Sequence, residues 1–156
     1  MNMMVTETLT RDYAFTGSLP AARPGTVALF SDNPETIAAI TPVCEFLALR
    51  LEVVSAGTDL TTALRTEKPL AVIADVDGTD HDGFHAMKLL ARYNPDLPML
   101  LLTGGDPALM GAADAVQELW GLTQVTQTGG FPLAGQLITF LFNAGRRAGC
   151  MRLVPV

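Results

Sequence analysis

Five short apolar segments alternate with five segments that carry helix signals, and this alternation is what most restricts the fold. The apolar segments are short enough for single strands, and Leu70–Ala74 is apolar at every position, as in a strand buried on both faces. Strict alternation of strands and helices predicts a parallel sheet covered by helices on both faces. The expected strands are 26–30, 51–55, 70–74, 99–102 and 122–126, and the expected helices begin near 34, 59, 84, 107 and 132.

Proline and asparagine residues mark where some of the helical segments are expected to begin or break. Asn33 followed by Pro34 is typical of a helix start, with Asn as N-cap and Pro at the first helical position. Pro42 lies inside the same segment, which extends to about Arg50, and its missing N–H predicts a kink or a break. The last strand is the least apolar of the five, which favours an edge position.

The 156 residues are enough for one domain with a proper core. Residues 1–25 are rich in Thr, Ser, Gly and Pro, and we expect a flexible leader or partner-binding arm, with a start-site artefact as the alternative. Residues 26–148 form the expected domain, and 149–156 form a C-terminal tail. Apolar residues make up 49% and charged residues 17%, which argues against disorder.

The net charge of −6 argues against direct binding to nucleic acid, whereas an acidic pocket for a divalent cation is compatible with it. The first ten residues lack the basic and apolar regions of a signal peptide. No apolar run reaches the ~18 residues of a membrane span. Cys44 and Cys150 lie in apolar contexts, so we expect free thiols in a reducing, cytoplasmic protein.

Polar side chains follow four of the expected strands. In a parallel α/β sheet, ligands bind beyond the carboxyl ends of the strands, so these side chains are expected to converge. The carboxylates suit Mg²⁺, a carboxylate beside that cation can attack a phosphoryl group, and a nearby hydroxyl can bond a phosphoryl oxygen. The plain alternative is a loop aspartate that caps a turn. The residues concerned are Ser31 and Asp32, Asp75 and Asp77, Thr103, and Thr126 to Thr128.

From Thr26 to about Arg147 the chain resembles a response-regulator receiver domain. Asp75 matches the phosphorylated aspartate of that family, because Asp82-Gly83 follows it at the family's spacing, and Thr103 matches the switch hydroxyl. The resemblance implies a flavodoxin-like sandwich with strand order 2-1-3-4-5, with Asp32, Asp75 and Asp77 as Mg²⁺ ligands. It also implies a stand-alone signalling module rather than an enzyme, whose partners are a histidine kinase or phosphotransfer protein and a downstream protein.

Two positions depart from the family pattern. Ser31 stands where receivers carry the first acidic residue, and the lysine after the fifth strand has no counterpart between Gln124 and Pro132. Gln127 or Thr128 would supply only a neutral hydrogen bond, roughly half as strong as a charge-assisted one. These departures predict an atypical receiver and leave open a scaffold that works without phosphorylation.

A second family also fits part of this stretch. Asp75-Val76-Asp77-Gly78-Thr79 resembles the motif of haloacid-dehalogenase-like phosphatases, where the first Asp is the nucleophile and the second the acid/base. That motif normally follows the first strand of its fold, whereas two strand–helix units precede it here. An Mg²⁺-dependent phosphatase is therefore the alternative. His81 and His85 match no metal-site spacing, and we expect an exposed loop residue and an ordinary helix residue.

The last helix is expected to bury a stripe formed by Leu133, Leu137, Phe140 and Leu141. Ile138 and Phe142 project elsewhere in this pattern. We expect them to belong to a homodimer or partner surface formed by the fourth helix, the fifth strand and the fifth helix. The alternative is that the leader or the tail covers them.

Overall fold

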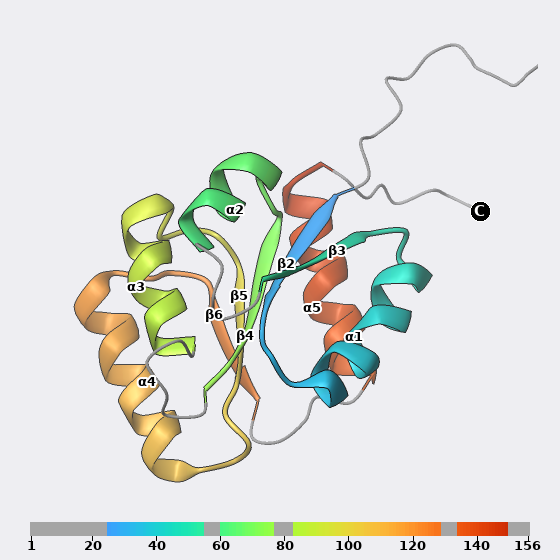
Figure 1. Ribbon diagram of the computed structural model, residues 1–156. Helices are drawn as coiled ribbons and strands as arrows, with labels where there is room; N and C mark the ends of the chain where they lie inside the picture. Colours follow the sequence, from blue (N-terminus) through green and yellow to red (C-terminus); the bar gives the residue numbers. More distant parts are fainter. Residues whose placement is uncertain (1–24, 55–59, 77–82, 129–133, 150–156) are drawn as a thin grey trace, which may run out of the picture.

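The computed structural model describes residues 25–54, 60–76, 83–128 and 134–149, and it confirms the parallel sheet (Figure 1). The five strands lie in the order β3-β2-β4-β5-β6, and each pairs with its neighbours in parallel. In chain order this is 2-1-3-4-5, the flavodoxin-like order that was expected. The strands are β2 (Thr26–Phe30), β3 (Arg50–Val54), β4 (Ala71–Asp75), β5 (Met99–Leu102) and β6 (Val125–Thr128).

Helices cover both faces of the sheet, as Figure 1 shows. α1 and α5 pack on one face, and α2, α3 and α4 pack on the other, which gives three layers. None of the described helices is long and apolar enough to cross a bilayer. Their bounds are α1 (Pro34–Phe46), α2 (Leu60–Glu67), α3 (Gly83–Tyr93), α4 (Pro107–Trp120) and α5 (Ala134–Arg147).

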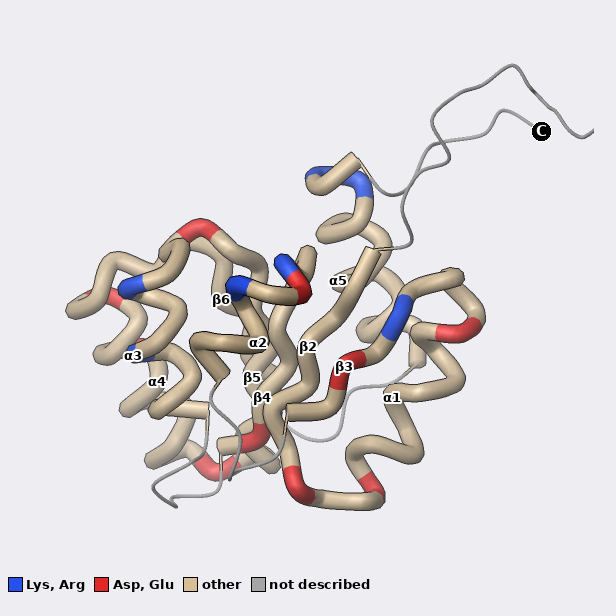
Figure 2. Tube along the Cα trace, turned by 45° about the horizontal axis from the view of Figure 1, so that its top comes forward, with Lys and Arg blue, Asp and Glu red and all other residues tan. Residues whose placement is uncertain are grey.

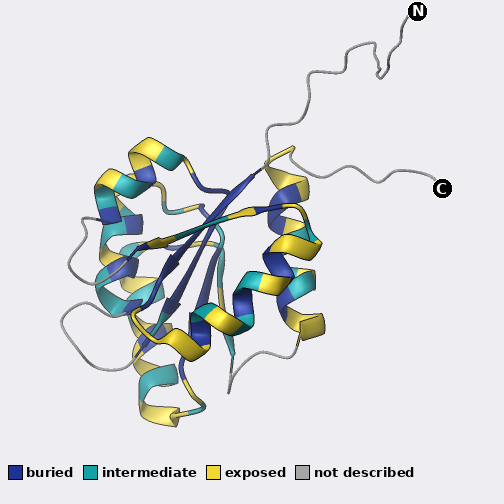
Figure 3. Ribbon diagram, turned by 45° about the vertical axis from the view of Figure 1, so that its right-hand side comes forward, coloured by how far each residue is buried: buried dark blue, intermediate teal, exposed yellow. Residues whose placement is uncertain are grey.

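The sheet separates two apolar cores, and β2, β4 and β5 contribute to both. Alternate residues along β4 show this: Val72 and Ala74 face α2 and α3, whereas Ala71 and Ile73 face α1 and α5. Burial of every position in β2 and β5 accounts for their continuous apolar sequences (Figure 3). The outer strands β3 and β6 are only partly buried, as their sequences indicate.

The start of α1 follows its sequence signal. The Asn33 side chain accepts a hydrogen bond from the Glu35 amide at 2.9 Å, and Pro34 occupies the first turn. The helix continues through Pro42 and ends at Phe46 rather than near Arg50. Pro42 therefore does not split the helix: its ring lies on the exposed face, and one missing N–H is tolerated.

The last strand begins three residues later than expected and ends two residues later. Residues 122–126 were the expected strand, but β6 runs from Val125 to Thr128. Leu122 instead belongs to the end of α4, where its amide donates to the Gln117 carbonyl at 3.0 Å and its side chain enters the core. Gln127 and Thr128 thus lie within the strand rather than beyond its end.

Candidate functional site

The strand register aligns the predicted site residues at the carboxyl edge of the sheet. Phe30 pairs with Ala74, so Ser31 lies level with Asp75, and Asp75 pairs with Leu102, the residue before Thr103. Asp75 is half-buried, whereas Ser31 and Thr103 are buried. This edge therefore carries a carboxylate flanked by two buried hydroxyl residues from neighbouring strands.

Ser31 forms a direct hydrogen bond with Asp75. The Ser31 hydroxyl donates to Oδ2 of Asp75, and its oxygen accepts the Asn33 amide at 3.1 Å. Because the amide occupies the acceptor side of the hydroxyl, the proton of Ser31 is directed toward the carboxylate. The residue that replaces an acidic position of the receiver pattern thus contacts the predicted phosphoacceptor itself.

Thr36 is a site residue that the sequence analysis missed. It lies in the first turn of α1, is 2% exposed, and its hydroxyl is 3.5 Å from Oδ1 of Asp75. Each carboxylate oxygen therefore has a hydroxyl donor. A signal was available: Thr36 lies one turn before the buried Ile40, so a helix that buries Ile40 also turns Thr36 toward the sheet.

Thr103 does not bond Asp75 in this structure. Its hydroxyl donates to the Thr128 carbonyl at 2.8 Å and so joins β5 to the end of β6. To reach a phosphoryl group on Asp75, the hydroxyl would have to leave that carbonyl and rotate about χ1. Thr103 thus occupies the expected position next to the site, with a side chain engaged in a strand-to-strand contact.

Two of the three expected metal ligands fall within the described residues. Asp32 is exposed just beyond β2, Asp75 ends β4, and Asp77 lies outside the described residues. No group of three or more metal-ligating side chains occurs in the part of the chain that the structure describes. Two carboxylates with adjacent hydroxyls still suit Mg²⁺, which commonly takes one or two protein carboxylates and keeps several waters.

Charge is distributed unevenly along the strands, with acidic residues following the ends of β2 and β4 (Figure 2). Asp32, Glu35, Asp75 and Asp106 all lie at the carboxyl end of the sheet. The described basic residues lie at the amino end, apart from Lys88 in the middle of α3; they are Arg50, Arg65, Lys68, Arg92, Arg146 and Arg147. A cation at the candidate site would therefore meet an attractive field.

Gly83 packs directly beneath the site. A Cβ at this position would lie 2.6 Å from Val76 Cγ2 and 3.2 Å from the Asp75 carbonyl oxygen, closer than side chains approach one another. Glycine thus allows the first turn of α3 to approach the strand that carries Asp75. Of the Asp82-Gly83 pair that supported the resemblance, Asp82 lies outside the described residues.

Gln127 is directed away from Asp75, so it does not take the place of the missing lysine. Its side-chain amide donates to Asp114 of α4 at 2.7 Å, and its Oε1 is buried with no hydrogen-bond partner among the described residues. Thr128 contributes its carbonyl to Thr103, and its hydroxyl is 3.4 Å from the Leu101 carbonyl. Neither side chain is positioned by these bonds to face the carboxylate.

Two expectations about other residues have different outcomes. The ring centroids of His85 and Phe30 lie 6.3 Å apart in a tilted contact, which fits an ordinary helix residue. His81 lies outside the described residues.

The expectation that Ile138 projects away from the core is wrong, because Ile138 packs against the core cluster between the sheet, α1 and α5. That cluster includes Ile40 and Val43 of α1, the helix that lies beside α5 on the same face of the sheet. Phe142 is half-buried.

Comparison with known proteins agrees with this geometry, although no family model matches the chain. A stretch of 102 residues, 65% of the chain, is 29% identical to the probable transcriptional regulatory protein TcrX of Mycobacterium tuberculosis. The chain spans about 40% of the length of that relative.

Solved structures of receiver domains resemble the chain more completely. The N-terminal signal receiver domain of a Bacteroides fragilis response regulator is 24% identical, with a TM-score of 0.62 over 78% of this chain and 97% of that one. A CheY-like receiver domain protein of Methanospirillum hungatei is 12% identical, with a TM-score of 0.63 over 81% and 98%. Vibrio cholerae chemotaxis protein CheY4 is 15% identical, with a TM-score of 0.60 over 78% and 99%. The chain has the fold of response-regulator receiver domains.

Proposed function

We propose that the chain is an atypical receiver domain of two-component signalling that accepts a phosphoryl group on Asp75. The observation that carries this proposal is the placement of Asp75: a half-buried carboxylate at the end of the central strand β4, held by hydroxyls at both oxygens. The receiver fold and the match to TcrX support the same function. The proposed partners are a histidine kinase or phosphotransfer protein and a downstream protein.

The reaction moves a phosphoryl group from the donor, a histidine nitrogen of a kinase or phosphotransfer protein or the oxygen of acetyl phosphate, to an oxygen of Asp75. An oxygen of Asp75 attacks the phosphorus of the donor, a new O–P bond forms, and the bond from phosphorus to the donor breaks with its electron pair. Ser31 and Thr36 hold the carboxylate in one orientation, which reduces the ordering required at the moment of attack. Each oxygen keeps a lone pair for the attack, because a carboxylate offers about four acceptor sites.

Mg²⁺ is the cation that this site would take. Asp32 and Asp75 would hold it, and the bound cation would neutralise charge on the phosphoryl oxygens. Ser31 cannot replace the missing carboxylate, since a neutral hydroxyl is a weaker ligand than an acid. We therefore infer weak Mg²⁺ binding compared with a site that has a third carboxylate.

Acetyl phosphate with Mg²⁺, followed by intact-mass spectrometry, tests the proposal. The expected result is a gain of one phosphoryl group that is absent in Asp75→Asn. Asp96→Asn is a matched control, because Asp96 lies at the opposite end of the sheet and accepts a bond from Thr123 that asparagine can still accept. An unmodified wild-type protein, or an adduct that persists in Asp75→Asn, contradicts the proposal.

The phosphatase alternative predicts that the phosphoryl group on Asp75 is released to water, so that the protein turns over its substrate. It requires turnover of a chromogenic phosphate ester with Mg²⁺, whereas a receiver predicts none. The motif follows the third strand of the described sheet, not the first, and the solved structures that resemble the chain are receiver domains. The structure therefore favours a phosphoacceptor over a phosphatase.

The missing lysine bears on how phosphorylation would be transmitted. Because Gln127 bonds Asp114, the end of β6 is linked to α4 rather than to Asp75. A shift of the Thr103 hydroxyl would release the Thr128 carbonyl and so alter the end of the same strand. We propose that any output passes through α4, β6 and α5, the surface also expected for a homodimer.

A further inference from the structure

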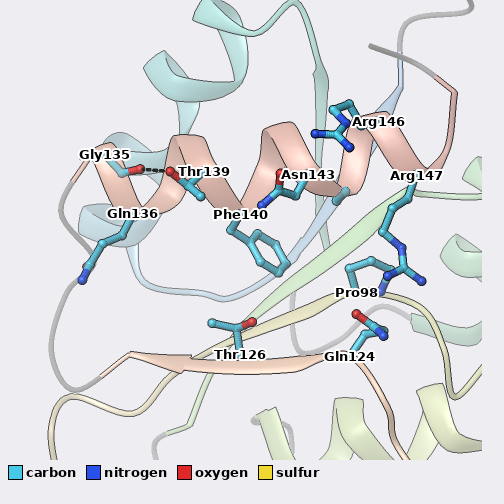
Figure 4. Close-up of a pocket in the computed structure, with 11 residues that line it drawn as sticks. Pro98, Gln124, Thr126, Gly135, Gln136, Thr139, Phe140, Asn143, Arg146 and Arg147 are labelled. Carbon is cyan, nitrogen blue, oxygen red and sulfur yellow. Dashed lines mark hydrogen bonds between the residues drawn. The ribbon is translucent and has the colours of Figure 1, made fainter. Parts of the chain in front are cut away.

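A groove runs between β6 and α5 at the edge of the sheet. Figure 4 shows the Phe140 ring extending from α5 toward the strand, with Gln124 and Thr126 facing the helix. The groove has a volume of about 970 Å³, comparable to a binding site for a sizeable ligand. Arg146 and Arg147 line one end, and none of the described residues that line the groove is acidic.

A second hollow continues the groove toward the start of the described chain. It has a volume of about 340 Å³, is lined by Gly25 and Thr26, and shares Pro98, Ala144 and Arg147 with the larger groove. Gly25 is the first described residue. The chain therefore enters the described domain at a hollow that adjoins the groove along the edge strand.

The edge strand itself has open hydrogen-bonding groups. The Gln124 carbonyl accepts the Met99 amide at 2.9 Å, so Gln124, Thr126 and Thr128 direct their backbone groups toward β5. Backbone groups alternate along a strand, so Val125 and Gln127 direct theirs outward, where the described sheet has no further strand. An open edge of this kind is a template for another strand.

The sequence before Gly25 contains a segment suited to that edge. Residues 5–16 carry no Pro or Gly and are rich in Thr, aromatic and apolar residues, as strands are. Leu9, Tyr13 and Phe15 fall on one side of an extended chain, and Thr8, Thr10 and Ala14 fall on the other. Leu9, Tyr13 and Phe15 could fill the groove around Phe140, and the two charged residues on the same side, Glu7 and Arg11, have opposite signs.

We propose that residues 5–16 form an antiparallel strand on the open edge of β6 within the same molecule. Four strand spacings separate that edge position from β2, about 19 Å at roughly 4.8 Å each. Residues 17–24 can span up to about 26 Å at roughly 3.3 Å per residue, which is enough. An antiparallel strand ends at the amino end of the sheet, where β2 begins, so no crossover is needed.

The C-terminal residues are a poorer occupant. A strand formed by 150–156 would follow α5 and lie parallel to β6. Its connection would cross on the α1 and α5 face, whereas α3 and α4 connect successive strands in the same direction on the opposite face. That crossover would have the opposite hand, which parallel connections almost never adopt. The proposal is independent of whether Asp75 is phosphorylated.

Amide hydrogen exchange in the full chain, measured by NMR, tests the added strand. Wild type is compared with Leu9→Asp/Phe15→Asp, which places charge on the apolar side, and with Thr8→Asp/Ala14→Asp, which adds the same charge on the other side. We expect the Val125 and Gln127 amides to exchange at least about tenfold faster in Leu9→Asp/Phe15→Asp than in the other two proteins. The inward amides of Thr126 and Thr128 report whether each variant remains folded.

Two results would overturn the proposal. One is equal exchange of the Val125 and Gln127 amides in wild type and in Leu9→Asp/Phe15→Asp, which would leave the edge open or covered by something other than this segment. The other is protection that disappears on dilution together with a dimeric mass by light scattering, which would assign the strand to a second copy. A monomer with concentration-independent protection supports the proposal.

Discussion

Ser31, at the end of β2, donates a hydrogen bond to Asp75, at the end of β4, across two paired strands. The bond places a neutral hydroxyl against the carboxylate that we propose as phosphoacceptor. An acidic residue at position 31 would instead repel Asp75 unless a cation lay between them. The Ser31 hydroxyl thus ties the carboxylate of Asp75 to the end of β2.

Removing the Ser31 hydroxyl is expected to destabilise the fold. Ser31→Ala leaves Oδ2 of Asp75 and the Asn33 amide without this partner, and a hydrogen bond to a charged group contributes roughly 1.5–3 kcal/mol. We expect the free energy of unfolding in urea to fall by about 1.5 kcal/mol. Thr41→Ala removes a hydroxyl bonded only to the Ile37 carbonyl and serves as control. An equal loss of unfolding free energy in the two variants would show that the hydrogen bond to Asp75 contributes no more than an ordinary hydroxyl bond.

Adding a carboxylate at position 31 should create a dependence on Mg²⁺. Ser31→Asp places two carboxylates on neighbouring strands, so we expect a lower melting temperature in EDTA and recovery on adding millimolar Mg²⁺. Recovery arises because binding to the folded state alone raises its stability. Ser31→Asn has a similar shape without the charge and should not respond. A Mg²⁺ response no larger than that of Ser31→Asn would contradict a metal site at this edge.

Gly83→Ala should disturb the site from below. The new Cβ would lie 2.6 Å from Val76 Cγ2 and 3.2 Å from the Asp75 carbonyl oxygen, so α3 must move away or β4 must bend. Overpacking of this kind costs about 1–3 kcal/mol, and we expect slower labelling of Asp75 by acetyl phosphate as well. Gly111→Ala is the control, because its Cβ would meet nothing within 4 Å. Wild-type stability and labelling in Gly83→Ala would show that the contact relaxes without consequence.

Cys44 should make the protein less stable in strong base. Burial raises the pKa of its thiol from 9.0 to about 11, and the side chain is 1% exposed. As pH rises, the thiol of the unfolded chain ionises before that of the folded protein. The stability that the buried neutral thiol contributes is therefore complete below pH 9 and is lost between about pH 9 and pH 11. The loss amounts to about 2–3 kcal/mol of unfolding free energy. In a Cys150→Ser background, urea titrations at several pH values should show this slope, and further replacement of Cys44 by Ala should remove it.

A homodimer through α4, β6 and α5 would depend on apolar side chains of that surface. Leu119 of α4 is 77% exposed, and Phe142 of α5 is half-buried. If the dimer forms, light scattering should report a doubled mass that falls to the monomer in Leu119→Glu and in Phe142→Glu. Phe46→Glu changes an equally exposed side chain, on α1, and is expected to leave the mass unchanged. A mass that none of the three substitutions alters would exclude this surface.

Local patterns in the sequence were sufficient to predict the elements whose signals were strong. The Asn33-Pro34 start of α1, the start of α4 near residue 107 and the apolar run of β4 were each found near the expected residues, because helix starts and buried runs are local properties. β6 was misplaced because Leu122 is apolar yet belongs to the end of α4. Ile138 was misassigned because helical spacing alone does not tell which neighbouring elements pack beside a helix.

The candidate site divides in the same way. The sequence by itself determined that Asp75 ends a buried parallel strand and that Ser31, Asp32 and Thr103 end its neighbours, since the alternation of strands and helices dictates which ends meet. Only the tertiary structure decided that Thr36 reaches Asp75, that Thr103 bonds Thr128 and that Gln127 bonds Asp114. These choices depend on side-chain directions across elements distant in sequence, where packing selects one rotamer among several.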